Sequence, residues 1–414
     1  MTPTMVVAVH DGFYGNGTGA GRCNRALLDV LAGCLAPGVR LVVLPVHLNP
    51  GSPEYDAGWH AGTRTIVERA SGIVRPVGNG TGGRRRFAGL PGFRHACASA
   101  ARAIHALIGD GAGPLLVVTS DVPFYGLAPL LPVPVRRSVV AVAHATAVLH
   151  DPGDAERVDW ERDGLRDLVA HGGRVAAISR HMREHLAVEY RIPDRSIVDL
   201  VNGLTRQEWR IAAPDARLLP DAAAGGFLLA LGRAVPYKGW DDLLDALKLA
   251  GPVPHTLLAA VTDGPEVTPY QEHLARRIAG EGLDVTLVTR FDPAVASLMA
   301  HPALAALVVP SRAEPFGRIP MEAFAAGTAP VVATGAGGLA ELVINGVTGY
   351  SAEAGDAASL AQAIGRALAT DPEGRARLRE AGRQLVASRY SYERNVHTFL
   401  QEVAPWAVAP WDAT

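Results

Sequence analysis

The chain has 414 residues, of which 48% are hydrophobic and 19% are charged, a balance typical of a folded, water-soluble protein. Its 39 basic and 41 acidic residues leave a formal charge of −2, which gives no reason to expect a nucleic acid or an anionic membrane as a partner. A single hydrophobic core rarely serves so long a chain, so we expect two domains.

The cysteines and the apolar runs indicate the cellular compartment in which the protein is expected. Cys23, Cys34 and Cys97 are odd in number and widely spaced, so they show neither a disulfide framework nor a metal-binding pattern. The N-terminal apolar run, residues 6–9, is too short for a secretion signal, and no apolar stretch is long enough to span a bilayer. We therefore expect a cytoplasmic protein without stable membrane insertion.

Short β-branched runs, bounded by Gly, Pro or polar residues, predict strands along the whole chain. In the first half they cover residues 5–10, 39–47, 114–122, 138–146, 174–180 and 197–203. In the second half they cover residues 226–233, 255–264, 284–291, 304–311 and 329–335. The runs are continuously apolar rather than alternating, which is typical of strands buried on both faces of a parallel sheet.

Helical patterns alternate with these strands, for example over residues 23–35, 180–190, 240–250, 322–327 and 357–369. Because the alternation runs through the chain twice, it predicts two doubly wound α/β domains. The Ala-, Asp- and Pro-rich stretch 212–225 is the best candidate linker. We therefore expect an N-terminal domain over 1–211, a C-terminal domain over 212–390, and a terminal segment over 391–414. The helix in that segment, 391–406, could pack back on the N-terminal domain.

One segment, residues 49–92, does not fit the alternation. It is rich in glycine and carries the run GGRRRFAG at 82–89. Long insertions without secondary structure are usually functional, so this segment is interpreted as a mobile loop near the mouth of an active site. The plainer interpretation of Arg84, Arg85 and Arg86 is a solvated basic run.

The first strand leads into a glycine-rich loop, GNGTGAGR at 15–22, which opens a helix. Glycines permit close approach of the backbone, and a helix N-terminus offers N–H groups to an anion. The spacing departs from the Gly-x-Gly-x-x-Gly dinucleotide fingerprint, and no ribose-binding acid ends the second strand, which disfavours NAD. His10, Asp11 and Tyr14 follow the same strand; they could line the acceptor side or be ordinary loop residues.

Two cations follow the first strand of the second domain, in GRAVPYKGW. Arg233 lies at the carboxyl end of that strand, where ligands of open α/β sheets bind, and Lys238 lies five residues further on in a Pro/Gly turn. Two cations in one crevice suit a diphosphate leaving group. The alternative is that Lys238 is an ordinary surface lysine.

Two carboxylates surround an elbow in SRAEPFGRIPMEAFAAG, residues 311–327. Pro315 and Gly317 mark a turn from a strand into a helix, with Glu314 in the loop and Glu322 on the helix. Carboxylates accept paired hydrogen bonds, so they suit the vicinal hydroxyls of a ribose or a hexose. The alternative for Glu322 is an interaction with the helix dipole alone.

The segment EPFGRIPME resembles the E-x7-E element of retaining glycosyltransferases of the group 1 type, which have the GT-B fold. Further segments resemble other parts of that family in the same order along the chain. They are TGAGRCNRAL at 18–27, AVAHAT at 141–146, AISRHM at 177–182, VNGL at 201–204, LGRAVPYKGWDDLLDAL at 231–247 and TGAGGLAELVINGVTGY at 334–350. One departure is Thr18, which stands where the family has the first glycine of its Gly-Gly loop.

The resemblance implies a GT-B architecture, in which two Rossmann-like doubly wound parallel-sheet domains face each other across a cleft. It implies that Arg233 and Lys238 hold the donor diphosphate, Glu322 the ribose hydroxyls and Glu314 the hydroxyls of the donor sugar. It further implies that the backbone of Phe316, Gly317, Arg318 and Ile319 lies beside sugar and phosphates. His144 would lie beside the donor sugar, and Gly19 would approach the phosphates from the N-terminal domain.

The function implied is retaining transfer of a hexosyl unit from a nucleotide diphosphate sugar to a hydroxyl of a small soluble acceptor. UDP is expected before GDP as the nucleotide, and natural-product biosynthesis is the expected setting. His144, Arg233, Lys238 and Glu314 would be the catalytic residues, with neither a metal nor a cofactor. The alternatives are a membrane-lipid or polysaccharide acceptor, a nucleotide-sugar epimerase of the same architecture, and a sugar-nucleotide-binding protein without turnover. The sequence leaves the acceptor, the sugar, the nucleotide and the oligomeric state open.

Overall fold

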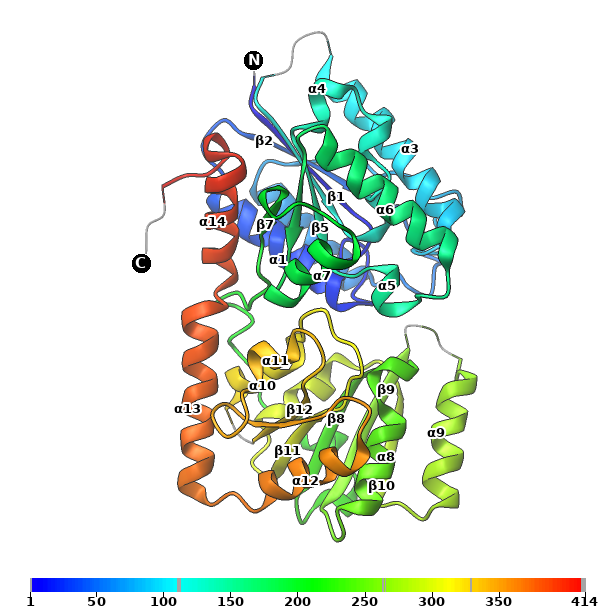
Figure 1. Cartoon of the computed structure of the whole chain (residues 1–414), viewed down its shortest axis with the longest axis vertical. Coiled ribbons are helices and arrows are strands. Elements are labelled where there is room, and N and C mark those ends of the chain that lie inside the picture. Colours follow the sequence, from blue (N-terminus) through cyan, green and yellow to red (C-terminus); the bar gives the residue numbers. More distant parts are fainter. Residues whose placement is uncertain (1, 110–112, 263, 265, 328–329, 411–414) are drawn as a thin grey trace. The chain divides into compact units, whose positions relative to one another are not determined.

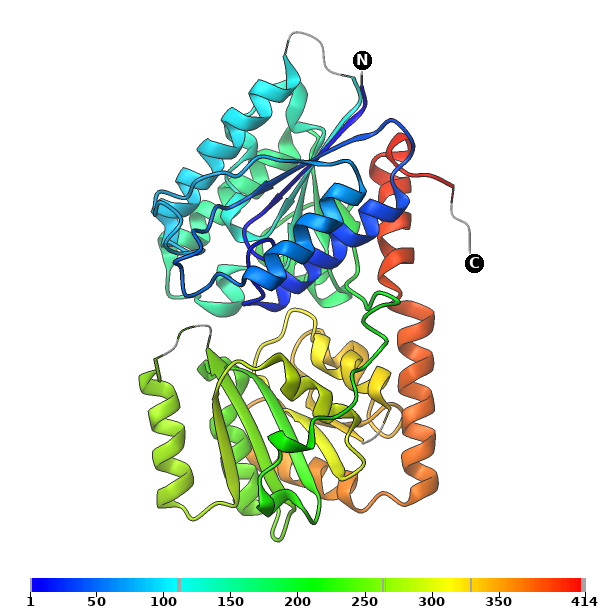
Figure 2. The same cartoon turned by 180° about the vertical axis from the view of Figure 1, so that it is seen from behind.

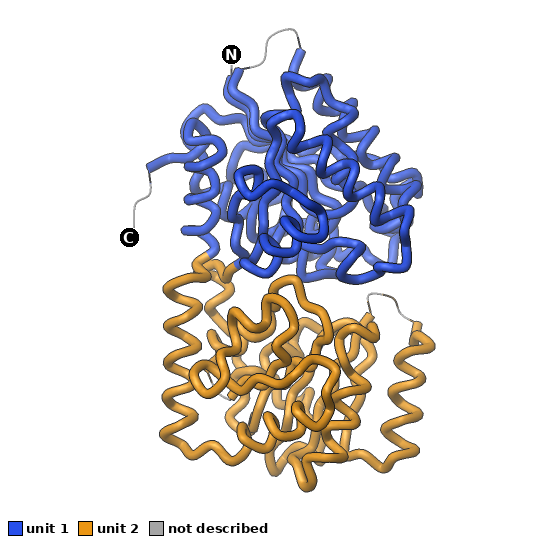
Figure 3. The backbone as a smooth tube through the Cα atoms, viewed as in Figure 1, with its two compact units in different colours: residues 1–202, 392–414 blue, residues 203–391 orange. Residues whose placement is uncertain are grey.

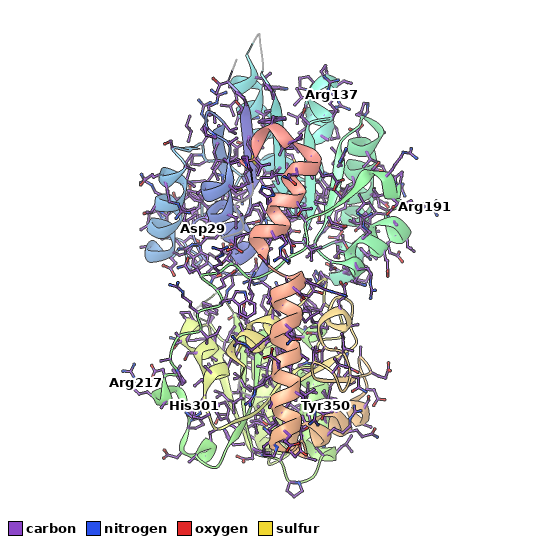
Figure 4. All side chains as sticks on the ribbon, turned by 90° about the vertical axis from the view of Figure 1, so that its left-hand side faces the viewer. Asp29, Arg137, Arg191, Arg217, His301 and Tyr350 are labelled. Carbon is purple, nitrogen blue, oxygen red and sulfur yellow. The ribbon has the colours of Figure 1, made fainter. Side chains whose placement is uncertain are left out.

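The structure, a computed structural model, describes residues 2–109, 113–262, 264, 266–327 and 330–410 (Figure 1). The chain divides into two compact units (Figure 3). Unit 1 comprises Met1–Asn202 and Tyr392–Thr414, and unit 2 comprises Gly203–Ser391. The expected linker, residues 212–225, therefore belongs to unit 2. Within it Arg217 points outward (Figure 4), with 89% of its side chain exposed, and pairs with Asp215.

Unit 1 contains a seven-stranded parallel sheet in the order β3-β2-β1-β4-β5-β6-β7. The strands are β1 Thr4–Val9, β2 Arg40–Pro45, β3 Ile73–Val74, β4 Leu115–Ser120, β5 Val139–Ala143, β6 Arg174–Ala177 and β7 Ile197–Asp199. The central strand β1 is buried along its whole length, as its continuous apolar run predicted.

Helices cover both faces of this sheet. Helices α1 (Gly19–Cys34) and α2 (Ala57–Arg69) lie against one face (Figure 2), and α3 (Gly89–Ile108) and α6 (Ala155–Ala170) lie against the other (Figure 1). The remaining helical elements are η1 Val122–Phe124, η2 Ala128–Leu130, α4 Val133–Arg136, α5 Ala147–His150, α7 Arg180–Glu189 and η3 Asp194–Ser196. Thr18, Asp56, Asp154 and Ser179 accept backbone N–H groups at the starts of α1, α2, α6 and α7.

The C-terminal helix α14 (Tyr392–Val403) belongs to unit 1, where it packs against α1. The side-chain Nδ2 of Asn395 donates to the Val201 carbonyl at 2.9 Å. Beyond η8 (Pro405–Ala407), Val408 forms an antiparallel bridge with Leu35. Residues 392–410 are thus an integral part of the first unit.

The structure corrects the interpretation of residues 49–92 as a mobile loop. The segment holds α2, β3 and the start of α3, and the β3 edge strand pairs with β2. Arg84 and Arg85 are exposed, as a solvated run predicts, but Arg86 is buried. No pattern in the sequence indicated this strand because β3 is only two residues long.

Unit 2 contains a six-stranded parallel sheet in the order β10-β9-β8-β11-β12-β13. The strands are β8 Phe227–Arg233, β9 His255–Thr262, β10 Val285–Arg290, β11 Leu304–Val309, β12 Val331–Thr334 and β13 Tyr350–Ala352. Asp263 and Ala329, at the ends of two predicted strands, lie outside the described residues. The strands β3 and β13 are the additions that the sequence did not predict.

The helices of unit 2 are α8 Trp240–Leu249, α9 Pro269–Gly280, α10 Arg318–Ala326, α11 Leu339–Leu342, α12 Ala357–Leu368 and α13 Pro372–Arg389, with 3-10 segments η4 Ala216–Leu218, η5 Asp221–Ala223, η6 Pro236–Lys238 and η7 Pro293–Ala300. Buried apolar residues of α8 and α12 share one core with Leu228, Leu258 and Val308 of the sheet. Helix α10 packs on α13. No helix in the described ranges combines the length and the apolar character needed to cross a membrane.

Candidate active site

In unit 2, two segments that are far apart in sequence meet at the carboxyl ends of neighbouring strands. η6 follows β8, and the elbow of residues 310–317 follows β11, which pairs with β8. The meeting requires Gly239, whose φ is 72° and whose added Cβ would come within 3.0 Å of the Pro310 carbonyl oxygen. The Arg312 amide also donates to the Tyr237 carbonyl at 2.8 Å.

The two segments bring together Lys238 and Glu314, two residues of the donor site that the resemblance implies. The Lys238 ammonium donates to Glu314 Oε2, and the two side chains are 13% and 15% exposed. Glu314 Oε2 also lies 3.4 Å from the Ser311 hydroxyl, and the Glu314 carbonyl accepts the Gly338 amide at 2.9 Å. A partly buried ion pair with additional hydrogen bonds holds both side chains in one orientation.

Arg233 lies at the end of β8 and is exposed. Its guanidinium donates to the Tyr237 hydroxyl, and its Cζ lies 5.8 Å from the centre of that ring. Lys238 Nζ lies 6.0 Å from the same ring centre. Tyr237 therefore contacts both predicted cations. The sequence did not predict this contact, although Tyr237 lies inside the motif GRAVPYKGW.

The elbow before α10 is shaped by glycine. Gly317 has φ 102° and precedes the helix, where no side chain of the described residues forms a capping hydrogen bond. An added Cβ on Gly338 would come within 3.0 Å of the Phe316 backbone, so the turn at 335–338 packs directly against the elbow. Phe316 is 2% exposed and packs edge-on against Tyr390, whereas Ile319 is partly exposed. The uncapped N–H groups of this nine-residue helix can donate to an anion.

Glu322 lies one turn into α10, where its Oε1 is 3.4 Å from Nε of Arg318. The Arg318 guanidinium also donates to Glu208 at 2.5 Å and to the Gly203 carbonyl at 3.1 Å. Its side chain is only 9% exposed. Arg318, predicted as a donor contact, therefore uses its guanidinium to join the start of unit 2 to α10, and its backbone remains the part that a ligand could contact.

The two predicted site residues of unit 1 follow its strands. Gly19 begins α1, and nothing lies within 4 Å of the Cβ that a side chain would add there. Thr18, the departure from the family pattern, caps the helix by accepting the Gly21 amide at 3.0 Å. His144 follows β5 and is 8% exposed.

The loop that carries His144 is held by buried side chains from other elements. The Ala145 amide donates to Asp121 Oδ1 at 3.1 Å, and the Ala145 carbonyl accepts the Tyr125 hydroxyl at 2.8 Å. The Ala147 amide donates to Glu161 Oε2 at 2.8 Å. Glu161 is fully buried, and burial raises the pKa of its carboxyl group. The hydrogen bond from the Tyr190 hydroxyl and the charge of Arg157 act in the opposite direction and lower that pKa.

His10, Asp11 and Tyr14, which could have lined the acceptor side, are all buried at the carboxyl end of β1. Asp11 forms an ion pair with Arg86 at 2.6 Å. Tyr14 packs on the His60 ring at 4.7 Å between ring centres, and burial raises the pKa of its hydroxyl to about 12. The Asp11 and Tyr14 side chains thus contact other residues of unit 1.

Comparison with known proteins gives a consistent family. The family model described as "Glycosyl transferases group 1" matches residues 223–385. A glycogen synthase of Mycobacterium tuberculosis is 32% identical over 231 residues, which are 55% of this chain and 52% of that protein. The chain thus spans about half the length of that relative. The lipopolysaccharide 1,2-N-acetylglucosaminetransferase of Salmonella typhimurium is 30% identical over 293 residues, 66% of this chain and 76% of that protein.

Solved structures share the fold. A sucrose-phosphate synthase from Thermosynechococcus elongatus superimposes with a TM-score of 0.72 at 21% identity, over 97% of this chain and 98% of that one. Anabaena HepE, solved in complex with UDP-glucose, superimposes with a TM-score of 0.67 at 20% identity, over 97% of this chain and 99% of that one. The predicted class of two Rossmann-like parallel-sheet domains with the GT-B fold is confirmed.

Proposed function

The chain belongs to the group 1 glycosyltransferases, and we propose that it moves a hexosyl unit from a nucleotide diphosphate sugar to an acceptor hydroxyl with retention of configuration. UDP is the proposed nucleotide and GDP the second candidate, and the proposed acceptor is a small soluble molecule. The complex of Anabaena HepE with UDP-glucose supports a nucleotide sugar as donor.

The observation that carries the proposal is the Lys238–Glu314 pair between the ends of β8 and β11. An ammonium has three N–H donors, so Lys238 can keep Glu314 and still donate to a phosphate oxygen. Arg233, exposed at the end of β8, supplies a second cation. Cations placed where negative charge develops stabilise a departing diphosphate more in the transition state than in the ground state.

The carboxylates take the hydroxyl groups of the donor. Glu314, held in place by Lys238, accepts hydrogen bonds from the hexose, and Glu322, one turn into α10, accepts those of the ribose. The first N–H groups of α10, around Phe316 to Ile319, face the phosphates and sugar. This division uses side chains for the hydroxyls and backbone for the anion.

In the proposed reaction the bond between the anomeric carbon and the diphosphate oxygen breaks, and its electron pair leaves with the diphosphate. The acceptor oxygen bonds to the same face of that carbon, and its proton passes to a phosphate oxygen. Retention needs neither a metal nor a cofactor in this scheme. His144, on the loop held by Asp121 and Glu161, contacts the sugar, and Gly19 contacts the diphosphate.

A panel of UDP-, GDP- and dTDP-sugars in thermal unfolding tests the proposal, because a ligand at 100 times its Kd stabilises the folded state by about 2.7 kcal/mol. The stabilising donor is then offered with an acceptor panel, and the anomeric configuration of the product is read by NMR. Absence of both stabilisation and transfer would contradict the proposal. Binding without transfer would instead identify a binding protein, and an isomerised nucleotide sugar would identify an epimerase.

A further inference from the structure

The one basic run in the predicted loop of unit 1 contains a buried arginine. Arg86 is 3% exposed in its side chain, and its NH1 donates to Asp11 Oδ1 at 2.6 Å. Its backbone amide donates to Glu54 Oε2 at 2.6 Å, and its NH2 lies 3.7 Å from Glu54 Oε1. Burying a guanidinium is costly unless it is paired, so this arrangement requires Asp11 and Glu54.

The same Asp11 carboxylate ties Arg86 to the start of α1. Asp11 Oδ2 accepts the Thr18 hydroxyl at 2.6 Å, and Oδ1 accepts the Gly12 amide at 2.7 Å. The Thr18 oxygen in turn accepts the Gly21 amide at 3.0 Å. A continuous chain of hydrogen bonds therefore runs from a buried cation to the first turn of the helix.

The glycines of residues 15–21 follow from this cluster. An added Cβ would come within 3.0 Å of the Arg86 guanidinium at Gly17, of the Asp11 carboxylate at Gly21, and of the Glu54 carbonyl at Gly15. At Gly19 it would meet no atom within 4 Å. Gly15, Gly17 and Gly21 are therefore required because the loop lies directly on Asp11, Glu54 and Arg86. Only at Gly19, among these four glycines, would an added Cβ point into open space.

We propose that Arg86 and Asp11 are positioning residues of the transfer reaction, which hold the loop of residues 15–19 so that Gly19 is presented to the donor diphosphate. This inference rests on the proposed function. It also explains Thr18, whose hydroxyl links Asp11 to the helix, at a position where the family pattern has glycine. A glycine-rich loop has many accessible backbone conformations, and the side-chain contacts of Arg86 and Asp11 restrict this one to a single conformation.

Thr18 offers the sharpest test because its side chain is small. Thr18→Val keeps the shape but removes both hydrogen bonds, and Thr18→Ser keeps them. We expect kcat/KM for the donor to fall about tenfold or more in Thr18→Val, since a small displacement of a positioning group is amplified in rate. The KM of the acceptor should be unchanged, and Thr18→Ser should restore activity. Asp371→Ala, which removes the cap of α13 elsewhere in the chain, is the matched control: it should lower Tm without lowering kcat/KM.

Arg86→Lys is the second test, with Arg84→Lys as its exposed control. Lysine keeps the charge but not the planar fork, so hydrogen exchange of amides 12–22 should accelerate and donor kcat/KM should fall in Arg86→Lys alone. If wild-type protein transfers sugar and both Thr18→Val and Arg86→Lys retain its kcat/KM, the inference is wrong while the proposed function stands. A wild type without turnover on any nucleotide sugar would overturn the proposed function and this inference with it. Should Arg86→Lys fail to fold, the Thr18 variants still decide the question.

Discussion

The Lys238 ammonium and the Glu314 carboxylate form an ion pair although 76 positions separate them in the sequence. Each side chain is largely covered, so neither can change its partner without moving the elbow or η6. The pair therefore orients at once the cation proposed to bind the diphosphate and the carboxylate proposed to bind the sugar hydroxyls.

Lys238→Ala should lower kcat/KM by about 10²-fold or more, because it removes a preorganised cation from the developing charge and releases Glu314. Lys248→Ala is the matched control, since Lys248 is a half-exposed lysine of the same unit that pairs with Glu281 on the surface. Steady-state kinetics with the stabilising donor measure both. Equal activity of the two variants would show that Lys238 does not stabilise the departing diphosphate.

Glu322→Gln should weaken nucleotide binding by about 10- to 100-fold, because a charged acceptor for the ribose hydroxyls becomes a neutral one. Calorimetric titration with UDP and with 2′-deoxyuridine diphosphate separates this role from a structural one. Wild-type protein should prefer the ribonucleotide, and the variant should lose that preference. Stability should change little, because Arg318 retains Glu208 and the Gly203 carbonyl. An unchanged preference would assign Glu322 to the Arg318 pair alone.

Asp121 combines a hydrogen bond with backbone strain. Its φ of 73° and ψ of 177° lie in a region that is nearly reserved for glycine, and its carboxylate accepts the Ala145 amide beside His144. Asp121→Gly should relieve about 1–3 kcal/mol of strain while losing the carboxylate, so Tm should change little and transfer should fall. Asp121→Asn keeps an acceptor and should retain more activity. Higher activity in Asp121→Gly than in Asp121→Asn would refute a role in positioning the loop.

His185 should make unit 1 sensitive to acid. Burial, then the neighbouring His181 and His150, lower the pKa of His185 from 6.5 to about 4, and its Nε2 lies 2.8 Å from the Thr146 hydroxyl. Between these values the unfolded chain binds a proton that the folded chain does not, so stability falls as pH drops from 6.5 towards 4.

The slope from this group can reach about 1.4 kcal/mol per pH unit. Urea unfolding at a series of pH values should therefore show a flatter profile in His185→Gln than in wild type. The exposed His95 provides the control, because His95→Gln should leave the profile unchanged. Parallel profiles in all three proteins would mean that His185 does not account for the acid sensitivity.

The fold class followed from the sequence because burial on both faces of a parallel strand leaves a local signal. Continuous apolar runs predicted every strand from β1 to β12 except β3. The turn residues Pro315 and Gly317 predicted the elbow before α10. The strand β3 was not predicted because two residues carry too little pattern. The three-residue strand β13, Tyr350–Ala352, was also not predicted, and its sequence YSA lacks a continuous apolar run. The order of motifs along the chain placed Lys238 and Glu314 in one expected donor site, but it did not predict their direct ion pair.

What the sequence by itself determined is the type and order of the elements and the chemistry at the ends of the strands, because these depend on local periodicity and on turn residues. The tertiary structure alone decided the partners of the charged side chains. Arg86 meets Asp11 across 75 positions and Arg318 meets Glu208 across 110, and neither pair has a local signature. A charge is solvated or buried according to which distant segment folds beside it. The three arginines of residues 84–86 therefore have the same local pattern, although only Arg86 is buried.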